Sequence, residues 1–118
     1  MEEKRRVKPI VLRDKEDGTE YTLEFTRNSV KFAESRGFKI DSIGNAPMSA
    51  VEELFFYSFR ANHPTVKREK IMKILYEDIV IPEGFVERLI DLYTAPFDVF
   101  SEEKDEEEIK NARMTVEL

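Results

Sequence analysis

The sequence contains no cysteine, which excludes a disulfide framework, a thiolate zinc site and a cysteine nucleophile. Its single histidine, His63, stands next to a proline at the end of an apolar segment, which favours a turn or capping role over catalysis. No apolar run approaches the roughly 20 residues that span a bilayer, and the charged start MEEKRRVK has no apolar signal core. We therefore expect a soluble cytoplasmic protein without membrane contact.

Motifs that carry chemistry are also absent. The sequence has no glycine-rich phosphate loop, no G-x-S-x-G, no H-E-x-x-H and no EF-hand pattern. Carboxylates are numerous, but no pair is marked for acid–base catalysis, because the sequence does not reveal which carboxyl lies in an apolar environment. We therefore predict no catalytic residues, no cofactor and no metal, in a protein that is not an enzyme.

The net charge of the chain argues against nucleic-acid binding, but less firmly than the missing motifs argue against catalysis. The chain carries 19 basic and 25 acidic residues among 118, a net charge of −6, which argues against nucleic-acid binding by the molecule as a whole. A local basic cluster nevertheless lies within residues 67–73, and it is most often simply a solvated helix face. The cluster consists of Lys67, Arg68, Lys70 and Lys73.

The most apolar part of the chain is the segment SAVEELFFYSFRANHP at residues 49–64. We predict that it forms one helix, with Ser49 as the N-cap and Glu52 completing a capping box. Pro64 is expected to end the helix, because it has no N–H to donate and restricts the residue before it.

Apolar residues extend around most of this predicted helix. Glu53 and Arg60 mark a narrow polar ridge, which Phe56 and Tyr57 flank. A helix with so little polar surface is either the central core helix or is partly covered by a second molecule. The expected core face contains Val51, Leu54, Phe55, Phe59 and Ala61.

The remaining segments define the fold class and the domain boundaries. We predict strands at 8–13 and 19–26 joined by the turn DKEDG, a helix capped by Thr26 or Asn28 and ended by Gly37, a loop at 39–48, and helices at 65–79 and 82–95. This order indicates the α+β class, mainly α, with an N-terminal β-hairpin packed on about four helices. The expected divisions are a flexible N-terminus at 1–7, a single globular domain at 8–100, and an acidic, flexible C-terminal tail with an apolar tip at 101–118.

Four segments in order carry a resemblance to a known family. They are FTRNSVKFAESRGF, VEELFFYSFRANHP with its F-x-x-x-H-P ending, LIDLYTAPFDVF and the terminal KN-x-x-M-x-VEL. Over residues 20–118 the chain resembles the tail assembly chaperones of long-tailed, non-contractile (siphovirus-type) bacteriophages and prophages of Gram-positive hosts. The resemblance implies a non-enzymatic protein of the host bacterial cytoplasm, absent from the mature virion, that binds the tape-measure protein and helps to bring tail-tube subunits to it.

We expect partner contacts at apolar residues outside the predicted core. For the aromatic residues the alternative is ordinary core packing, and for the tip it is a terminus without function. A homo-oligomer remains open, as do two other functions: a prophage-encoded adaptor or regulator that binds a host protein, and a small nucleic-acid-binding protein that uses the helix at 67–73. The expected partner-binding residues are Phe56, Tyr57, Phe97, Phe100, Met114, Val116 and Leu118.

Overall fold

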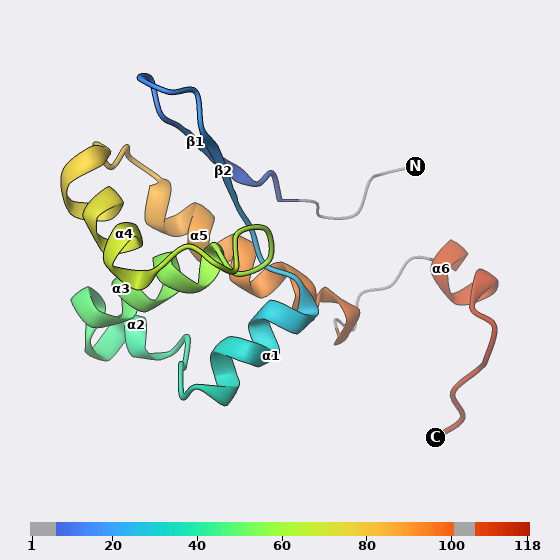
Figure 1. The fold of residues 1–118 in the computed structure, drawn as a ribbon. Helices are drawn as coiled ribbons and strands as arrows, with labels where there is room; N and C mark the ends of the chain where they lie inside the picture. The colour runs from blue at the N-terminus through green and yellow to red at the C-terminus, as the bar shows by residue number, and fades with distance from the viewer. Residues whose placement is uncertain (1–6, 101–105) are drawn as a thin grey trace.

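The computed structural model describes residues 7–100 and 106–118, and its N-terminal part is a β-hairpin (Figure 1). Strands β1 (Ile10–Arg13) and β2 (Glu20–Leu23) pair antiparallel, in the register that places Ile10 opposite Leu23 and Arg13 opposite Glu20. Both strands are shorter than the ranges predicted from the sequence. The alternation in β1 is clear, because Ile10 and Leu12 face the body while Val11 and Arg13 face solvent.

The turn between the strands is formed by the residues that the sequence indicated. The Asp14 carboxylate accepts the N–H of Glu16 at 2.8 Å, and the Gly18 N–H donates to the Asp14 carbonyl at 2.9 Å. Gly18 has a φ of +77°, in the left-handed region that glycine adopts without strain.

Helix α1 (Arg27–Ser35) begins at a capping box. The Thr26 side chain accepts the Ser29 N–H at 3.1 Å, and the Ser29 hydroxyl accepts the Thr26 N–H at 2.9 Å, so Thr26 rather than Asn28 is the cap. Gly37, with a φ of +95°, follows the end of the helix as predicted. The segment predicted as a loop contains a further short helix, α2 (Ser42–Asn45).

The central helix has different ends from those predicted. Helix α3 covers Pro47–Ser58, and Ser49 lies inside it instead of capping it. Pro47 occupies the first turn, where a missing N–H costs nothing and the fixed φ suits a helix. The helix ends at Ser58, before Pro64, and the free Ser58 carbonyl accepts the N–H of Glu24 at 3.1 Å, which ties this end of the helix to the hairpin.

The second half of the chain is also helical. It contains α4 (Arg68–Lys73), a π-helical turn η1 (Ile74–Asp78), α5 (Phe85–Thr94), a 3₁₀ helix η2 (Ala95–Phe100) and α6 (Glu106–Asn111). Helix α5 begins after Gly84, whose φ is +87°, and not at Pro82 as predicted. Pro96 lies inside η2. The chain changes there from the α-helix to the tighter 3₁₀ helix and does not leave helical structure.

Helix α3 lies at the centre and packs against α1, α2, α4 and α5 (Figure 1). Leu54, Phe55 and Phe59 are buried on it, and the hairpin adds Leu23 to the same core. The fold class predicted from the sequence is confirmed: the domain is α+β, mainly α, with an N-terminal hairpin. The predictions for residues 1–6 and for the acidic run through 105 lie outside the described residues.

Candidate functional site

The candidate site is an open groove between α1, α3 and the start of α4, which we call the aromatic groove. Its volume is about 260 Å³. Apolar rings form its floor and guanidinium groups stand at its rim. The groove is lined by Phe32, Arg36, Phe56, Tyr57, Phe59, Arg60, His63, Pro64, Val66 and Ile71.

Phe32 projects from α1 and lies under two positive groups. The Arg60 guanidinium carbon is 3.7 Å from the centre of the Phe32 ring, and that of Arg36 is 4.9 Å away. Such cation–π contacts are worth about 0.5–1 kcal/mol at exposed sites. The ring is half-buried, so the arginines cover a ring that the helical core leaves partly open.

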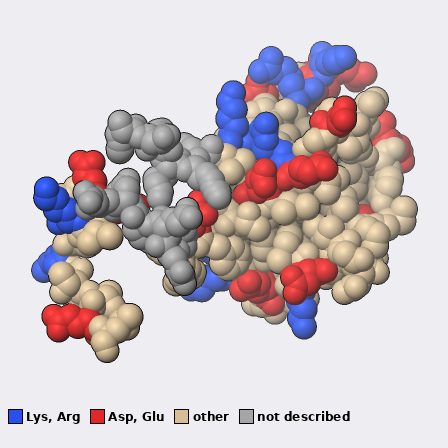
Figure 2. All heavy atoms as spheres, turned by 180° about the vertical axis from the view of Figure 1, so that it is seen from behind, with Lys and Arg blue, Asp and Glu red and all other residues tan. Residues whose placement is uncertain are grey.

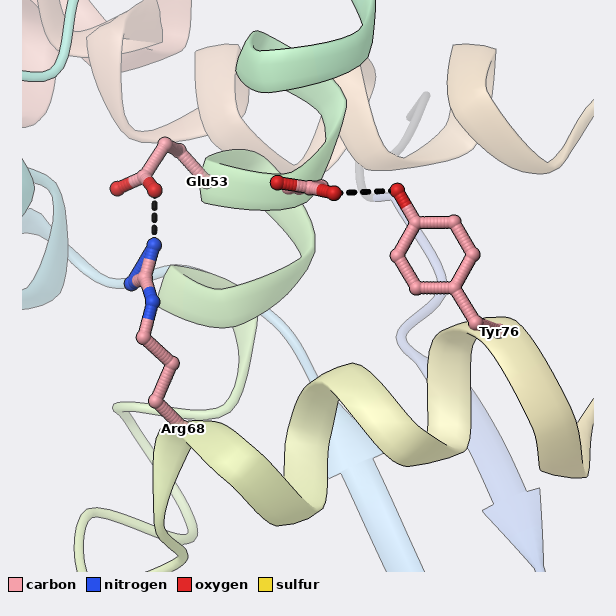
Figure 3. Close-up of polar contacts among 4 residues, drawn as sticks. Glu53, Arg68 and Tyr76 are labelled. Carbon is pink, nitrogen blue, oxygen red and sulfur yellow. Dashed lines mark hydrogen bonds and ion pairs between the residues drawn. The ribbon is translucent and has the colours of Figure 1, made fainter.

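Phe56 projects from α3 into the same groove. The Arg68 guanidinium carbon is 4.3 Å from the centre of its ring, and Arg68 also forms an ion pair with Glu53, one turn before Phe56 on α3 (Figure 3). Tyr76 of η1 donates a hydrogen bond to the neighbouring Glu52. These two links hold α4 and η1 against α3, so one wall of the groove is fixed in place.

Tyr57 also lines the aromatic groove, but its side chain is almost fully buried. Its side chain is 6% exposed, and its ring centre lies 5.9 Å from that of Phe38 and 6.1 Å from that of Phe32. One residue further along a helix turns a side chain by about 100°, which carries Tyr57 towards α1 while Phe56 stays in the groove. Burial raises the pKa of Tyr57, with Glu53 adding to the effect. Of the two placements that the sequence left open for Tyr57, partner contact and ordinary core packing, its burial favours core packing.

His63 has a specific structural role, which the sequence indicated only as a turn or cap. Its Nε2 atom accepts the backbone N–H of Thr22 at 2.9 Å, and its ring meets the Tyr21 ring edge to face at 5.3 Å. Asn62 donates to the Thr22 carbonyl at 3.2 Å. The turn after α3 thus covers the outer edge of β2. The F-x-x-x-H-P motif is the signal in the sequence, because the His63 N–H donates to the Phe59 carbonyl at 2.7 Å.

Phe97 and Phe100 lie at a different place, on η2, which we call the apolar end. Phe97 is 41% exposed and contacts the buried ring of Tyr93, with 6.2 Å between ring centres, whereas Phe100 is 81% exposed. A hollow of about 400 Å³ lies beside Phe97, between η2 and Val7. The structure therefore does not bring Phe97 and Phe100 into the aromatic groove.

The predicted apolar tip is separate again. Met114, Val116 and Leu118 follow α6 and are all exposed. Figure 1 draws this segment away from the helical body. The seven predicted contact residues thus divide into two that line the groove, of which Tyr57 is buried, two at the apolar end and three in the tip.

Two of the four residues in the predicted basic cluster form ion pairs within the fold. Arg68 pairs with Glu53, and Lys73 donates to the Asp78 carboxylate at 3.0 Å. That hydrogen bond, together with the negative charge of Asp78, raises the pKa of Lys73. Lys67 and Lys70 are exposed, so two of the four cations remain available to an outside anion.

Residues 7–100 and 106–118 offer neither a metal site nor a membrane span. In that part of the chain no three His, Asp or Glu side chains are placed to hold a metal ion together. No helix within it has both the length and the apolar character that a membrane span requires.

The fold and the groove together define a small, mainly helical α+β domain with an open aromatic surface. The chain belongs to a protein family described as a domain of unknown function, DUF5055, whose sequence model matches residues 4–118. No curated protein and no solved structure gives a significant match. Because the family description names no function, the resemblance to tail assembly chaperones stays a prediction.

Proposed function

We propose that this protein is a non-enzymatic tail assembly chaperone, which keeps a tape-measure protein soluble in the host cytoplasm while a phage tail is assembled. The observation that carries the proposal is the aromatic groove. Phe32 and Phe56 lie in an open channel beneath arginine side chains, and the tightly packed core lies behind them. This arrangement suits a protein that binds a second chain.

The chemistry of the groove favours a helical partner with an apolar seam. A long tape-measure helix presents apolar side chains at spacings of three and four residues, and such a seam can lie in a groove lined by rings. The guanidinium groups of Arg36 and Arg60 stand at the rim and have no ion pair with a described residue. Carboxylates that flank the seam would pair with them and fix the register of the helix.

The apolar end offers a second contact area to the same partner or to a tail-tube subunit. Phe100 is largely exposed, and Val99 and Phe97 are partly exposed beside it. Aromatic side chains that cluster on a surface are typical of protein interfaces. A rod-shaped partner is long enough to contact both this area and the aromatic groove.

Co-expression tests the proposal directly. The tape-measure protein encoded beside this gene is expressed in bacteria alone, with the wild-type chain, and with Phe56→Ala. We expect the tape-measure protein to be soluble with the wild-type chain, insoluble alone, and substantially less soluble with the variant. Ile81→Ala serves as the control, because Ile81 is exposed but lies outside the groove. A tape-measure protein that is equally insoluble in all four cultures would contradict the proposal.

Two alternatives from the sequence have their own tests. A prophage-encoded adaptor for a host protein predicts that no overlapping frame and no very long tape-measure gene follow this gene. Nucleic-acid binding through residues 67–73 predicts a mobility shift of DNA or RNA at low salt, which weakens steeply as salt is added. The ion pairs of Arg68 and Lys73 leave fewer free cations for that role.

A further inference from the structure

The two edges of the hairpin differ in how they are covered. On β2, the Thr22 N–H donates to His63 at 2.9 Å and the Thr22 carbonyl accepts from Asn62 at 3.2 Å. The Glu24 N–H, just beyond the strand, donates to the Ser58 carbonyl at 3.1 Å. The outer edge of β2 is therefore occupied at Thr22 and Glu24 by residues at and after the end of α3.

The edge of β1 is open. Val11 pairs with Thr22 in the register, and both polar backbone groups of Thr22 point away from β1. Val11 and Thr22 are therefore a non-hydrogen-bonded pair, and the N–H and carbonyl of Val11 point to the outer side of β1. Arg13, two residues further on, has the same orientation. No hydrogen bond from the described residues reaches the N–H or carbonyl of Val11.

A large hollow adjoins this open edge, and we call it the edge hollow. Its volume is about 710 Å³, and Ile10, Leu12, Ile74, Ile79 and Phe85 supply its apolar lining. Two more apolar side chains at its rim are uncovered, since Val11 is 51% exposed and Val80 is 91% exposed. An open strand edge beside an uncovered apolar surface is the arrangement that accepts an added strand.

The chain itself carries a segment with the matching pattern. In the tip, Met114, Val116 and Leu118 alternate with Thr115 and Glu117, which is the period of two that a half-buried strand requires. Residues 115–118 have no regular secondary structure, and the three apolar side chains are exposed. Among residues 7–100 and 106–118, none covers this apolar face.

We propose that residues 114–118 of a second copy of this chain add to the edge of β1 as a third strand parallel to β1, the direction in which Val116 presents its N–H to β1 while its side chain enters the edge hollow. The three apolar side chains of that segment would enter the edge hollow, while Thr115 and Glu117 would face outwards. Lys15 and Lys70 line the hollow and form no ion pair with a described residue. The hollow is also lined by Asp14, Glu16 and Asp78, and Figure 2 shows Lys and Arg side chains with Asp and Glu side chains among them in the upper part of the molecule, so charge alone does not select the segment.

A second copy is the favoured occupant because the C-terminal tip of the same chain lies at the lower right of the molecule, whereas the hairpin lies at the upper left (Figure 1). A single strand of five residues buries far less than the roughly 1,600 Å² of a standard interface. We therefore expect weak, concentration-dependent association, in which two copies exchange tips or a chain of copies forms. This inference does not rest on the proposed function.

Sedimentation velocity of the full-length protein over a concentration series tests the proposal, with two pairs of variants. Val116→Pro removes a backbone donor from the tip without touching the folded body, and Val116→Thr is its control. Val11→Pro removes the outward N–H of β1 while sparing the β1–β2 ladder, and Val11→Thr is its control. We expect both proline variants to lose the associated species and both threonine variants to retain it.

Three outcomes would overturn the proposal. One is a wild-type chain that stays monomeric throughout the series, and another is association that persists in Val116→Pro. The third is a monomer in which hydrogen exchange shows protection of the Val11 and Val116 amides, because the tip would then occupy the edge of its own chain. Solubility of the tape-measure protein is a separate readout, so the failure of one proposal is distinguishable from the failure of the other.

Discussion

Phe55 and Phe56 are adjacent in the sequence, yet their environments differ. The Phe55 ring is fully buried and lies 5.3 Å from the Phe59 ring and 6.0 Å from the Phe85 ring, whereas Phe56 is half-buried in the aromatic groove. The sequence predicted both placements, because Phe55 belongs to the broad apolar face and Phe56 flanks the ridge. It did not predict the burial of Tyr57, which depends on the position of Phe38 after α1.

We predict a large difference between the two alanine variants. Phe55→Ala should lower the free energy of unfolding by about 3–5 kcal/mol, since it removes a fully buried ring and leaves a cavity. Phe56→Ala should cost clearly less, because the ring is partly exposed and only one guanidinium covers it. Chemical denaturation monitored by circular dichroism measures both values. Equal losses would contradict the assignment of the helix faces.

Tyr93 predicts how stability changes at alkaline pH. Its ring is buried against Phe25 and Phe38, and burial raises the pKa of Tyr93 from 10.0 to about 12. Above pH 10 the unfolded chain loses this proton while the folded chain keeps it, so stability should fall between pH 10 and about 12.

The variant Tyr93→Phe keeps the ring and removes the titrating group. We expect the fall in the free energy of unfolding between neutral pH and pH 10–12 to be smaller in this variant than in the wild type. It should not vanish, because burial also raises the pKa of Tyr57. Denaturant titrations at a series of pH values give the comparison. An identical alkaline fall in both proteins would show that Tyr93 does not contribute.

At the scale of elements, periodicity predicted which segments form helices and strands, and it failed at their ends. Ile71, Ile74 and Leu75 are buried within the range 65–79 that was predicted as a helix, although that helix starts at Arg68 and continues as a π-helical turn. The ends of α3 depend on Pro47 and on the contact between Ser58 and Glu24 in the distant hairpin. Such contacts are tertiary, and no local pattern encodes them.

The cap of α1 gives a local prediction. Thr26→Ala removes the side-chain acceptor of the Ser29 N–H but keeps the hydrogen bond from the residue-26 N–H to the Ser29 hydroxyl, and it should cost about 1 kcal/mol. Asn28→Ala is the matched control, because Asn28 lies inside the first turn and caps nothing. Thermal or chemical unfolding resolves the difference. If the Asn28 variant loses as much stability as the Thr26 variant, the assignment of the cap is wrong.

The hydrogen bond between His63 and β2 gives a second prediction at the scale of elements. His63→Ala removes the acceptor of the Thr22 N–H, so the Thr22 amide should exchange with solvent much faster than in the wild type. The Tyr21 amide is the internal control, because Tyr21 belongs to the neighbouring pair, which bonds across to β1. Hydrogen exchange followed by NMR measures both. Equal acceleration at the two amides would indicate general destabilisation and not the loss of one contact.

At the scale of the whole molecule, the sequence predicted the class of the fold but not the groove. The aromatic groove combines Phe32 from α1, Phe56 from α3 and Arg68 from α4, which are brought together only by the packing of three helices. The turn after α3 likewise hydrogen-bonds to the outer edge of β2 and not to that of β1, so the two edges of the hairpin differ. Resemblance supplied the functional hypothesis, and the geometry of the groove gives it a surface that mutagenesis can address.

The most direct measurement is the affinity of the purified chain for soluble helical fragments of the tape-measure protein, by isothermal titration calorimetry. The account predicts binding by the wild type and by Ile81→Ala, and at least a tenfold loss of affinity, about 1.4 kcal/mol, for Phe56→Ala in a variant that remains folded. Binding by Phe56→Ala that equals the wild type, or no binding by any of the three proteins, would contradict the account.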